Sequence, residues 1–163
     1  MEKTDIRVRF TRNTLRESLI ALMKEKSILN ITIKEICEHA GLSRSTFYTY
    51  YNDQYDLLRQ IEEETLIESE KITQPYLGAE RKLNGWDLAA ILTDFLQFIA
   101  GNSNSIQVLL SKNGDSAFQE KFFRNGIGFV RQFREAAGIK PQNDEADKYG
   151  SAFWVSGALA LVQ

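Results

Sequence analysis

The sequence predicts an all-α protein, and three of its features support that fold class. Only 2 prolines interrupt 163 residues, which leaves room for long helices. Apolar residues recur at helical spacing through most of the chain, as Leu15, Leu19 and Met23 do near its start. Short stretches of glycine, asparagine, serine and aspartate, which cap or end helices, separate these segments. We therefore expect a small three-helix amino-terminal domain followed by a larger helical bundle.

Positive charge gathers at the start of the chain, where the first helix is expected from about Asp5 or Thr11 to Lys26. Up to Arg16, five basic residues stand against two acidic ones. The segment Ile61–Glu70, by contrast, holds five glutamates and no basic residue. The formal net charge is only -2, but this uneven distribution is typical of a protein with one end that faces nucleic acid.

A second helix is expected from Thr32 to Ala40 and a third directly after Gly41. Thr32 and Glu35 have the Thr-x-x-Glu spacing of a capping box, in which each residue satisfies a free backbone N–H of the first turn. Glycine at position 41 suits the left-handed conformation that ends a helix, and Ser43 can cap the next one. Helix, glycine turn and helix together predict a helix-turn-helix, whose second helix enters the major groove of DNA.

The third helix has two chemically different sides. A spacing of about 100° per residue places Phe47 and Tyr51 on the side that faces the core. The other side carries hydroxyl groups behind a leading arginine; its residues are Arg44, Ser45, Thr46, Tyr48, Thr49 and Tyr50. Arginine and hydroxyl side chains bond phosphates and base edges. The alternative is a short core helix with a tyrosine-rich surface.

The segment Thr32–Asp53, with Gly41-Leu-Ser-Arg-Ser-Thr-Phe at its centre, resembles the DNA-binding domain of TetR/AcrR-family transcriptional regulators. The similarity runs from about Arg12 to Leu58 and implies a TetR-like fold. Many family members carry a phosphate-binding lysine where this chain has Gln54, which can still donate a hydrogen bond but has no charge. We expect base-edge contacts from Arg44 and Thr46. The other residues expected at the DNA are Arg12, Thr32, Ser43, Ser45, Tyr48, Thr49, Tyr50 and Gln54.

A fourth helix is expected to start after Asp53, a suitable cap, and to continue to about Ile72. The resemblance implies that this helix links the two domains and transmits an effector signal. The DNA-binding domain is thus expected at 1–52 and the effector-binding and dimerisation domain at 53–163. The segment Gln74–Gly85, which contains Pro75, is expected to be a turn or connection.

Further helices are expected at Trp86–Ala100, at about Ser105–Ser111, at Ser116–Ala137 and from near Asp144. Phenylalanines are frequent on them, and the simplest interpretation is an aromatic core. A helical bundle also leaves apolar cavities for ligands. Candidate lining residues are Trp86, Phe95, Phe98, Phe122 and Phe129. The run Val108–Phe118 resembles the TetR-like branch that includes regulators of dihydroxyacetone utilisation, some of which answer to a protein co-regulator.

The last segment, Tyr149–Val162, mixes small residues with large apolar ones and is apolar almost all round. This pattern predicts one face buried in the bundle and one covered by a second subunit, with candidate contacts at Phe153, Trp154, Gly157 and Leu161. Two-fold pairing supplies the two DNA-binding domains that a palindromic operator requires. The alternative is a fully internal helix. Because the family usually continues with another helix, we expect the chain to lack its last helix at Gln163.

These features predict a sequence-specific DNA-binding transcriptional regulator: a dimeric repressor that an apolar effector, bound to the carboxy-terminal domain, releases from double-stranded DNA. The alternative is a regulator or activator controlled by a protein partner, without a small-molecule pocket. An enzyme is not expected, because catalysis needs a nucleophile, base or metal cluster, and the chain has one cysteine and one histidine. Glu35 and His39 are too few ligands for zinc, so neither metal nor cofactor is expected. With no apolar run of about 18 residues and no secretory signal, a cytoplasmic location is expected.

Overall fold

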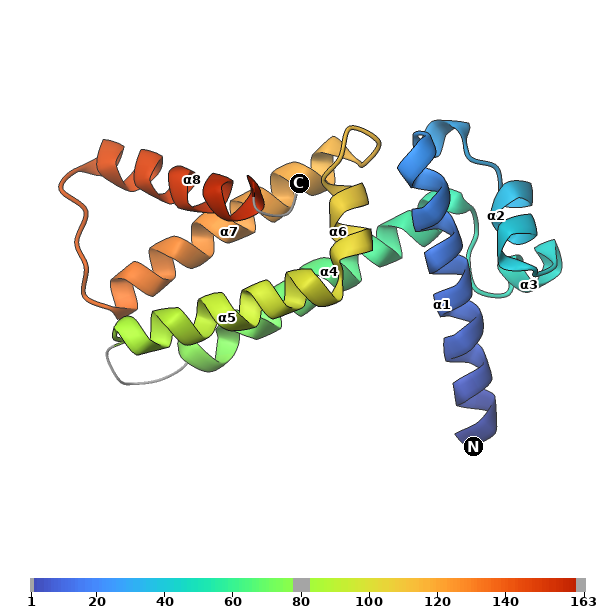
Figure 1. Ribbon diagram of the computed structural model, residues 1–163, viewed down its shortest axis with the longest axis horizontal. Helices are drawn as coiled ribbons and strands as arrows, with labels where there is room; N and C mark the ends of the chain where they lie inside the picture. Colours follow the sequence, from blue (N-terminus) through green and yellow to red (C-terminus); the bar gives the residue numbers. More distant parts are fainter. Residues whose placement is uncertain (1, 78–82, 161–163) are drawn as a thin grey trace. The chain divides into compact units, whose positions relative to one another are not determined.

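The computed structural model describes residues 2–77 and 83–160, and every regular element within these ranges is helical (Figure 1). The predicted all-α class is confirmed. The elements are α1 (Glu2–Glu25), the 3₁₀ helix η1 (Ile28–Asn30), α2 (Ile33–Ala40), α3 (Arg44–Tyr48), α4 (Gln54–Leu77), α5 (Gly85–Gly101), α6 (Ser103–Leu109), α7 (Ser116–Ala136) and α8 (Asp144–Ala160).

The chain forms two compact units. The head unit comprises Met1–Glu64 and Val108–Gly114, and the body unit comprises Thr65–Gln107 and Asp115–Gln163. Helix α4 starts in the head unit and continues into the body unit after Glu64. The segment Val108–Gly114 therefore joins the head, although it lies far from the other head residues in sequence.

The head unit is held together by apolar side chains from four helices. Leu15 and Leu19 of α1, Ile36 of α2, Phe47 of α3 and Leu57 of α4 are all fully buried. Each such side chain stabilises the fold by about 1.5–3 kcal/mol relative to an exposed one. The predicted stripe on α1 is confirmed, and the small size of α2 and α3 makes this shared core their main source of stability.

The segment Val108–Gly114 is anchored to α1. The side-chain amide of Asn113 donates to the backbone carbonyl of Met23 over 3.0 Å. Val108 and Leu109 are buried in the same segment. A carbonyl in the last turn of a helix has no partner inside the helix, so the Asn113 amide satisfies a group that would otherwise depend on water.

The body unit is built from the second part of α4 and from α5, α7 and α8. Leu83, Ile91 and Phe133 form its buried apolar cluster, with Tyr76 and Phe129 packed against it. Helices α7 and α8 approach closely at a glycine: a Cβ added to Gly126 would lie 3.0 Å from a methyl group of Val155. The small residue therefore sets the spacing of these two helices.

Helix α4 extends farther than the sequence predicted. Residues 74–77 were expected in a connection, but α4 ends at Leu77 with Pro75 inside its last turn. Tyr76 packs against the body cluster and its hydroxyl bonds the Asp94 carboxylate over 2.7 Å. Packing and this bond compensate for the backbone hydrogen bond that proline cannot make. The predicted starts of α5 and α8 agree with the structure to within about one residue.

Candidate nucleic-acid interface

The turn between α2 and α3 has the predicted geometry. Gly41 is in the left-handed region, with φ 65° and ψ 29°. The next amide, that of Leu42, donates to the carbonyl of Cys37 over 3.0 Å, so the end of α2 is satisfied. Ser43 then caps α3, because its Oγ accepts from the backbone N–H of Thr46 over 3.1 Å. These local bonds fix where α3 begins relative to α2.

One side of α3 is anchored in the head core. Phe47 is fully buried and Tyr51 is 2% exposed. The ring of Phe47 lies 5.7 Å, centroid to centroid, from the rings of both Tyr48 and Tyr51. The helix itself is short and ends at Tyr48, after which Tyr50 and Tyr51 both donate their amides to the Phe47 carbonyl. The predicted inward side is confirmed.

The opposite side of α3 is open to solvent. Arg44, Ser45 and Thr49 are exposed, Tyr48 is 57% exposed, and Thr46 is half-buried. Within the part of the chain that the structure describes, the Arg44 guanidinium has no hydrogen bond or ion pair. An arginine has five N–H donors and stays charged at any physiological pH. Arg44 is therefore ready to bond an anion or a base edge.

Hydroxyl groups beside Arg44 bond to one another. The Ser43 Oγ lies 2.8 Å from Ser45 Oγ and 2.9 Å from Thr46 Oγ1, and Thr49 Oγ1 donates to the Ser45 carbonyl over 3.0 Å. A hydroxyl has one donor and two acceptor positions, so each of these groups keeps capacity for a further bond. The cluster is polar, accessible and uncharged apart from Arg44.

The capping box at the start of α2 is confirmed in full. The Glu35 amide donates to Thr32 Oγ1 over 3.3 Å, and the Thr32 amide donates to Glu35 Oε2 over 2.9 Å. Lys26 Nζ lies 2.5 Å from Glu35 Oε1, and this bond, followed by those from Thr32, lowers the pKa of Glu35 from 4.5 to about 2. The Thr32 hydroxyl also bonds Glu35, so a phosphate contact by this hydroxyl requires that bond to open.

Arg12 is used inside the head unit. Its guanidinium donates to the Gln60 side-chain carbonyl over 3.0 Å and to the Tyr51 hydroxyl over 3.4 Å, and it lies 3.5 Å from the Glu64 carboxylate. Arg16 also pairs with Glu64. In this arrangement Arg12 ties α1 to α4, and its phosphate contact stays a prediction. Gln54, at the start of α4, is half-buried.

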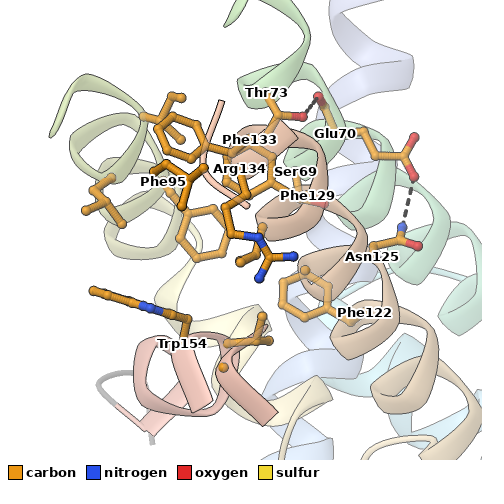
Figure 2. Close-up of a pocket in the computed structure, with 17 residues that line it drawn as sticks. Ser69, Glu70, Thr73, Phe95, Phe122, Asn125, Phe129, Phe133, Arg134 and Trp154 are labelled. Atoms are coloured by element: carbon orange, nitrogen blue, oxygen red, sulfur yellow. Dashed lines mark hydrogen bonds between the residues drawn. The ribbon is translucent and has the colours of Figure 1, made fainter. Parts of the chain in front are cut away.

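A second candidate site is a cavity of about 380 Å³ in the body unit, lined by α4, α5, α7 and α8 (Figure 2). Phe95, Phe122 and Phe129, three of the predicted lining residues, contribute to its wall. Trp86 and Phe98 do not. Trp86 is 86% exposed because it lies five residues before Ile91, about 140° around the helix from that lining residue. Phe98 lies farther along α5, with its ring 6.3 Å from that of Phe95.

The cavity also contains polar residues that sequence reasoning missed. The Glu70 carboxylate accepts from the Asn125 side-chain amide over 2.9 Å at the α4 side. Figure 2 shows Arg134 pointing into the cavity from α7. The sequence does contain a signal that points to Arg134. This residue lies one turn after Val130 on the apolar side of α7, where a charged side chain is unexpected.

Large apolar side chains of α8 remain exposed. Phe153 is 76% and Trp154 61% exposed, and Gly157 is exposed beside them. Trp154 also lines the cavity. Leu161, the fourth predicted dimer contact, lies outside the described residues. A fully internal α8 is therefore wrong for this chain.

Two other kinds of site are absent from the described residues. No helix there is both long and apolar enough to cross a membrane. The same residues contain no group of three or more histidine, cysteine, aspartate or glutamate side chains that could hold a metal ion.

The amino-terminal geometry has a counterpart among known proteins. The family model described as bacterial regulatory proteins, tetR family, matches residues 16–61, which include the whole helix-turn-helix. This match assigns residues 16–61 to the DNA-binding domain of the TetR family. An uncharacterized HTH-type transcriptional regulator of Bacillus subtilis, YxbF, is 40% identical over 50 residues, which are 31% of this chain and 13% of that protein.

Two further proteins are similar over most of this chain. An uncharacterized HTH-type transcriptional regulator of Haemophilus influenzae is 26% identical over 151 residues, which cover 86% of this chain and 72% of that protein. The solved structure of the dihydroxyacetone kinase operon activator DhaS superposes with a TM-score of 0.55 at 17% identity, over 93% of this chain and 81% of that one. This likeness shows a shared fold. These relatives are described as regulators and indicate no enzyme family.

Proposed function

We propose that this TetR-family protein is a dimeric transcriptional repressor that binds operator DNA and is released by an effector bound in the body cavity. The observation that carries the proposal is the unpaired, exposed Arg44 beside the hydroxyl cluster of α3. A surface helix whose only task is to face water would carry more carboxylates and fewer aromatic hydroxyls. Such a regulator would act where the operator DNA is, in the bacterial cytoplasm.

The proposed roles follow from side-chain chemistry and exposure. The Arg44 guanidinium has free N–H donors in the forked geometry that bonds the O6 and N7 atoms of guanine in the major groove. Thr46 lies two residues after Arg44 and is the second candidate for a base contact. Ser45, Tyr48 and Tyr50 would bond phosphates, which supply affinity but little sequence preference. Thr32 and Arg12 are weaker candidates, because both side chains already bond groups of the head.

A dimer would present two copies of α3 to successive major grooves, about 34–36 Å apart. The exposed Phe153, Trp154 and Gly157 of α8 support this proposal, because water-exposed aromatic rings of this size favour burial against another surface. Sedimentation equilibrium tests it: a monomer at all concentrations would oppose the proposed pairing.

Effector control requires two arrangements of the protein that differ in DNA affinity, and a ligand that binds one of them better. The cavity of about 380 Å³ falls in the usual size range of ligand pockets and supports a small-molecule effector. It argues against the alternative of a regulator without a pocket. Because DhaS is described as an operon activator, activation is the second candidate for the sign of regulation.

The decisive experiment selects bound fragments from random DNA and then measures affinity for the selected operator and for random DNA by fluorescence anisotropy. Arg44→Ala should weaken operator binding by about 5- to 150-fold, the equivalent of 1–3 kcal/mol for one bidentate base contact, and random DNA much less. Tyr48→Phe should weaken both alike. Arg124→Ala removes an exposed arginine from α7 of the body and serves as the matched control.

Two results would contradict the proposal. Selection that enriches no sequence would exclude sequence-specific DNA binding. Equal losses on operator and random DNA for Arg44→Ala would refute the base-contact role of that residue while leaving non-specific binding intact.

A further inference from the structure

Arg134, a residue of the cavity wall, has a buried hydrogen-bond donor that the protein does not use. Nε of Arg134 is shielded from solvent and has no hydrogen-bond partner among the described residues. The Arg134 side chain is only 18% exposed and lines the cavity. Leaving a buried donor unsatisfied is unfavourable, more so on a charged group, so an acceptor brought next to Arg134 would stabilise the protein.

Positive charge is in excess around that donor. Arg134 and Arg131 both pair with Asp147 of α8; the second pair has Nε 2.9 Å from Oδ2. Two guanidinium groups, each permanently charged, thus share one carboxylate. Glu70, the acidic residue among those that line the cavity, is exposed and bonded to Asn125, so solvent and this amide screen its repulsion of an anion.

The rest of the cavity wall favours a ligand with an apolar body. Most of this wall is apolar, and aromatic rings from three helices, including Phe95, Phe129 and Trp154, contribute to it. The hydroxyls of Ser69 and Thr73 donate to helix carbonyls, of Leu66 over 2.7 Å and of Glu70 over 2.9 Å. Their protons are therefore unavailable to a polyhydroxylated ligand, whose many polar groups this wall would leave unpaired.

From this arrangement we infer that the effector is an apolar carboxylic acid, whose ionised head accepts from Arg134 and whose aromatic or aliphatic body fills the ring-lined part of the cavity. That this ligand acts as an effector rests on the proposed function. The binding site and the ligand class depend on the cavity alone. A neutral acceptor would satisfy the donor without balancing the second guanidinium, and a cation would oppose both arginines.

The test compares each acid with its own amide. Isothermal titration calorimetry of the full chain, without DNA and at neutral pH, would use naphthylacetate against naphthylacetamide and decanoate against decanamide, with glycerol as the polyol. The acids should bind about tenfold or more tightly than the amides, the value of one charge-assisted hydrogen bond, and glycerol should not bind. Equal affinities within each pair, tighter binding of the amides, or no binding of either acid would overturn the inference.

Two variants locate the effect. Arg134→Gln should remove the preference for acids. Arg131→Gln removes the second positive charge beside Asp147 but leaves the donors of Arg134 and the lining in place, so it should reduce the preference less than Arg134→Gln does. Circular dichroism checks that both variants fold. If a variant does not fold, the ratio of acid affinity to amide affinity in the unaltered protein decides whether the inference holds. An acid that binds but fails to release operator DNA would refute the effector role in the proposed function and leave the ligand class standing.

Discussion

Replacing Gly41 with alanine isolates the backbone requirement of the turn that positions α3. The residue has φ 65°, and a Cβ added there would meet nothing within 4 Å. Crowding therefore contributes nothing, and the whole cost is that of holding an alanine in the left-handed region, about 1–2 kcal/mol. Gly41→Ala should lower the free energy of unfolding of the head unit by that amount, and Gly41→Asn by less, because asparagine tolerates this conformation better.

Gly128 provides the matched control. It lies in the middle of α7, and an added Cβ there also meets nothing within 4 Å, but no left-handed backbone is involved. Gly128→Ala should stabilise the protein by about 0.5–1 kcal/mol, because alanine favours helix interiors over glycine. The two substitutions add the same methyl group, so the opposite signs of their effects would come from the backbone alone.

Urea unfolding followed by circular dichroism gives the overall change, and hydrogen exchange of the amides of α2 and α3 assigns it to the head. A decrease of about 1–2 kcal/mol corresponds to a 5- to 30-fold larger open population of these amides. A Gly41→Ala protein with unaltered exchange in α2 and α3 would show that the left-handed turn is not required, and the argument for how α3 is positioned would fail.

Two further predictions concern the same unit. Because the folded pKa of Glu35 is about 2 and its ordinary value is 4.5, its bonds stabilise the head fully above pH 4.5 and are lost as the pH falls towards 2. Lys26→Met should raise that pKa in a carboxyl NMR titration, whereas Lys34→Met, whose partner is Glu38, should not; a Glu35 that titrates near 4.5 in the unaltered protein would contradict this. Phe47→Ala should cost about 3–5 kcal/mol and abolish operator binding, and Tyr48→Ala, at an exposed ring, should leave stability nearly unchanged. Thermal unfolding compares them, and equal losses would refute the two-sided description of α3.

Much of the head unit could be predicted because its helix caps and turns depend on residues that are close together in sequence. The capping box of Thr32 and Glu35, the left-handed Gly41 and the cap at Ser43 all join residues no more than five apart, so sequence spacing determines whether they form. The same holds for the two sides of α3, since a step of two residues, about 200°, places Ser45 on the side of the helix opposite Phe47. The exposed DNA-facing candidates follow from these short-range rules.

These short-range rules could not predict contacts between residues that are far apart in sequence. Arg12 bonds Tyr51 and Gln60, which are 39 and 48 residues away, and only packing of α1 on α4 brings them together. The segment around Pro75, where a turn was expected, is helical because Tyr76 packs against the body cluster and bonds Asp94. A pattern of residue types shows which side chains seek burial or partners, but not which of several partners they reach.

The sequence alone therefore specified the helices of the head, the turn that joins α2 to α3 and the chemistry presented by α3, since each depends on neighbours along the chain. Tertiary packing decided which aromatic residues surround a cavity and which, like Trp86, face water. It also decided that Arg134 lies in the cavity wall with Asp147 beside it, because these side chains meet only when α7 and α8 pack together.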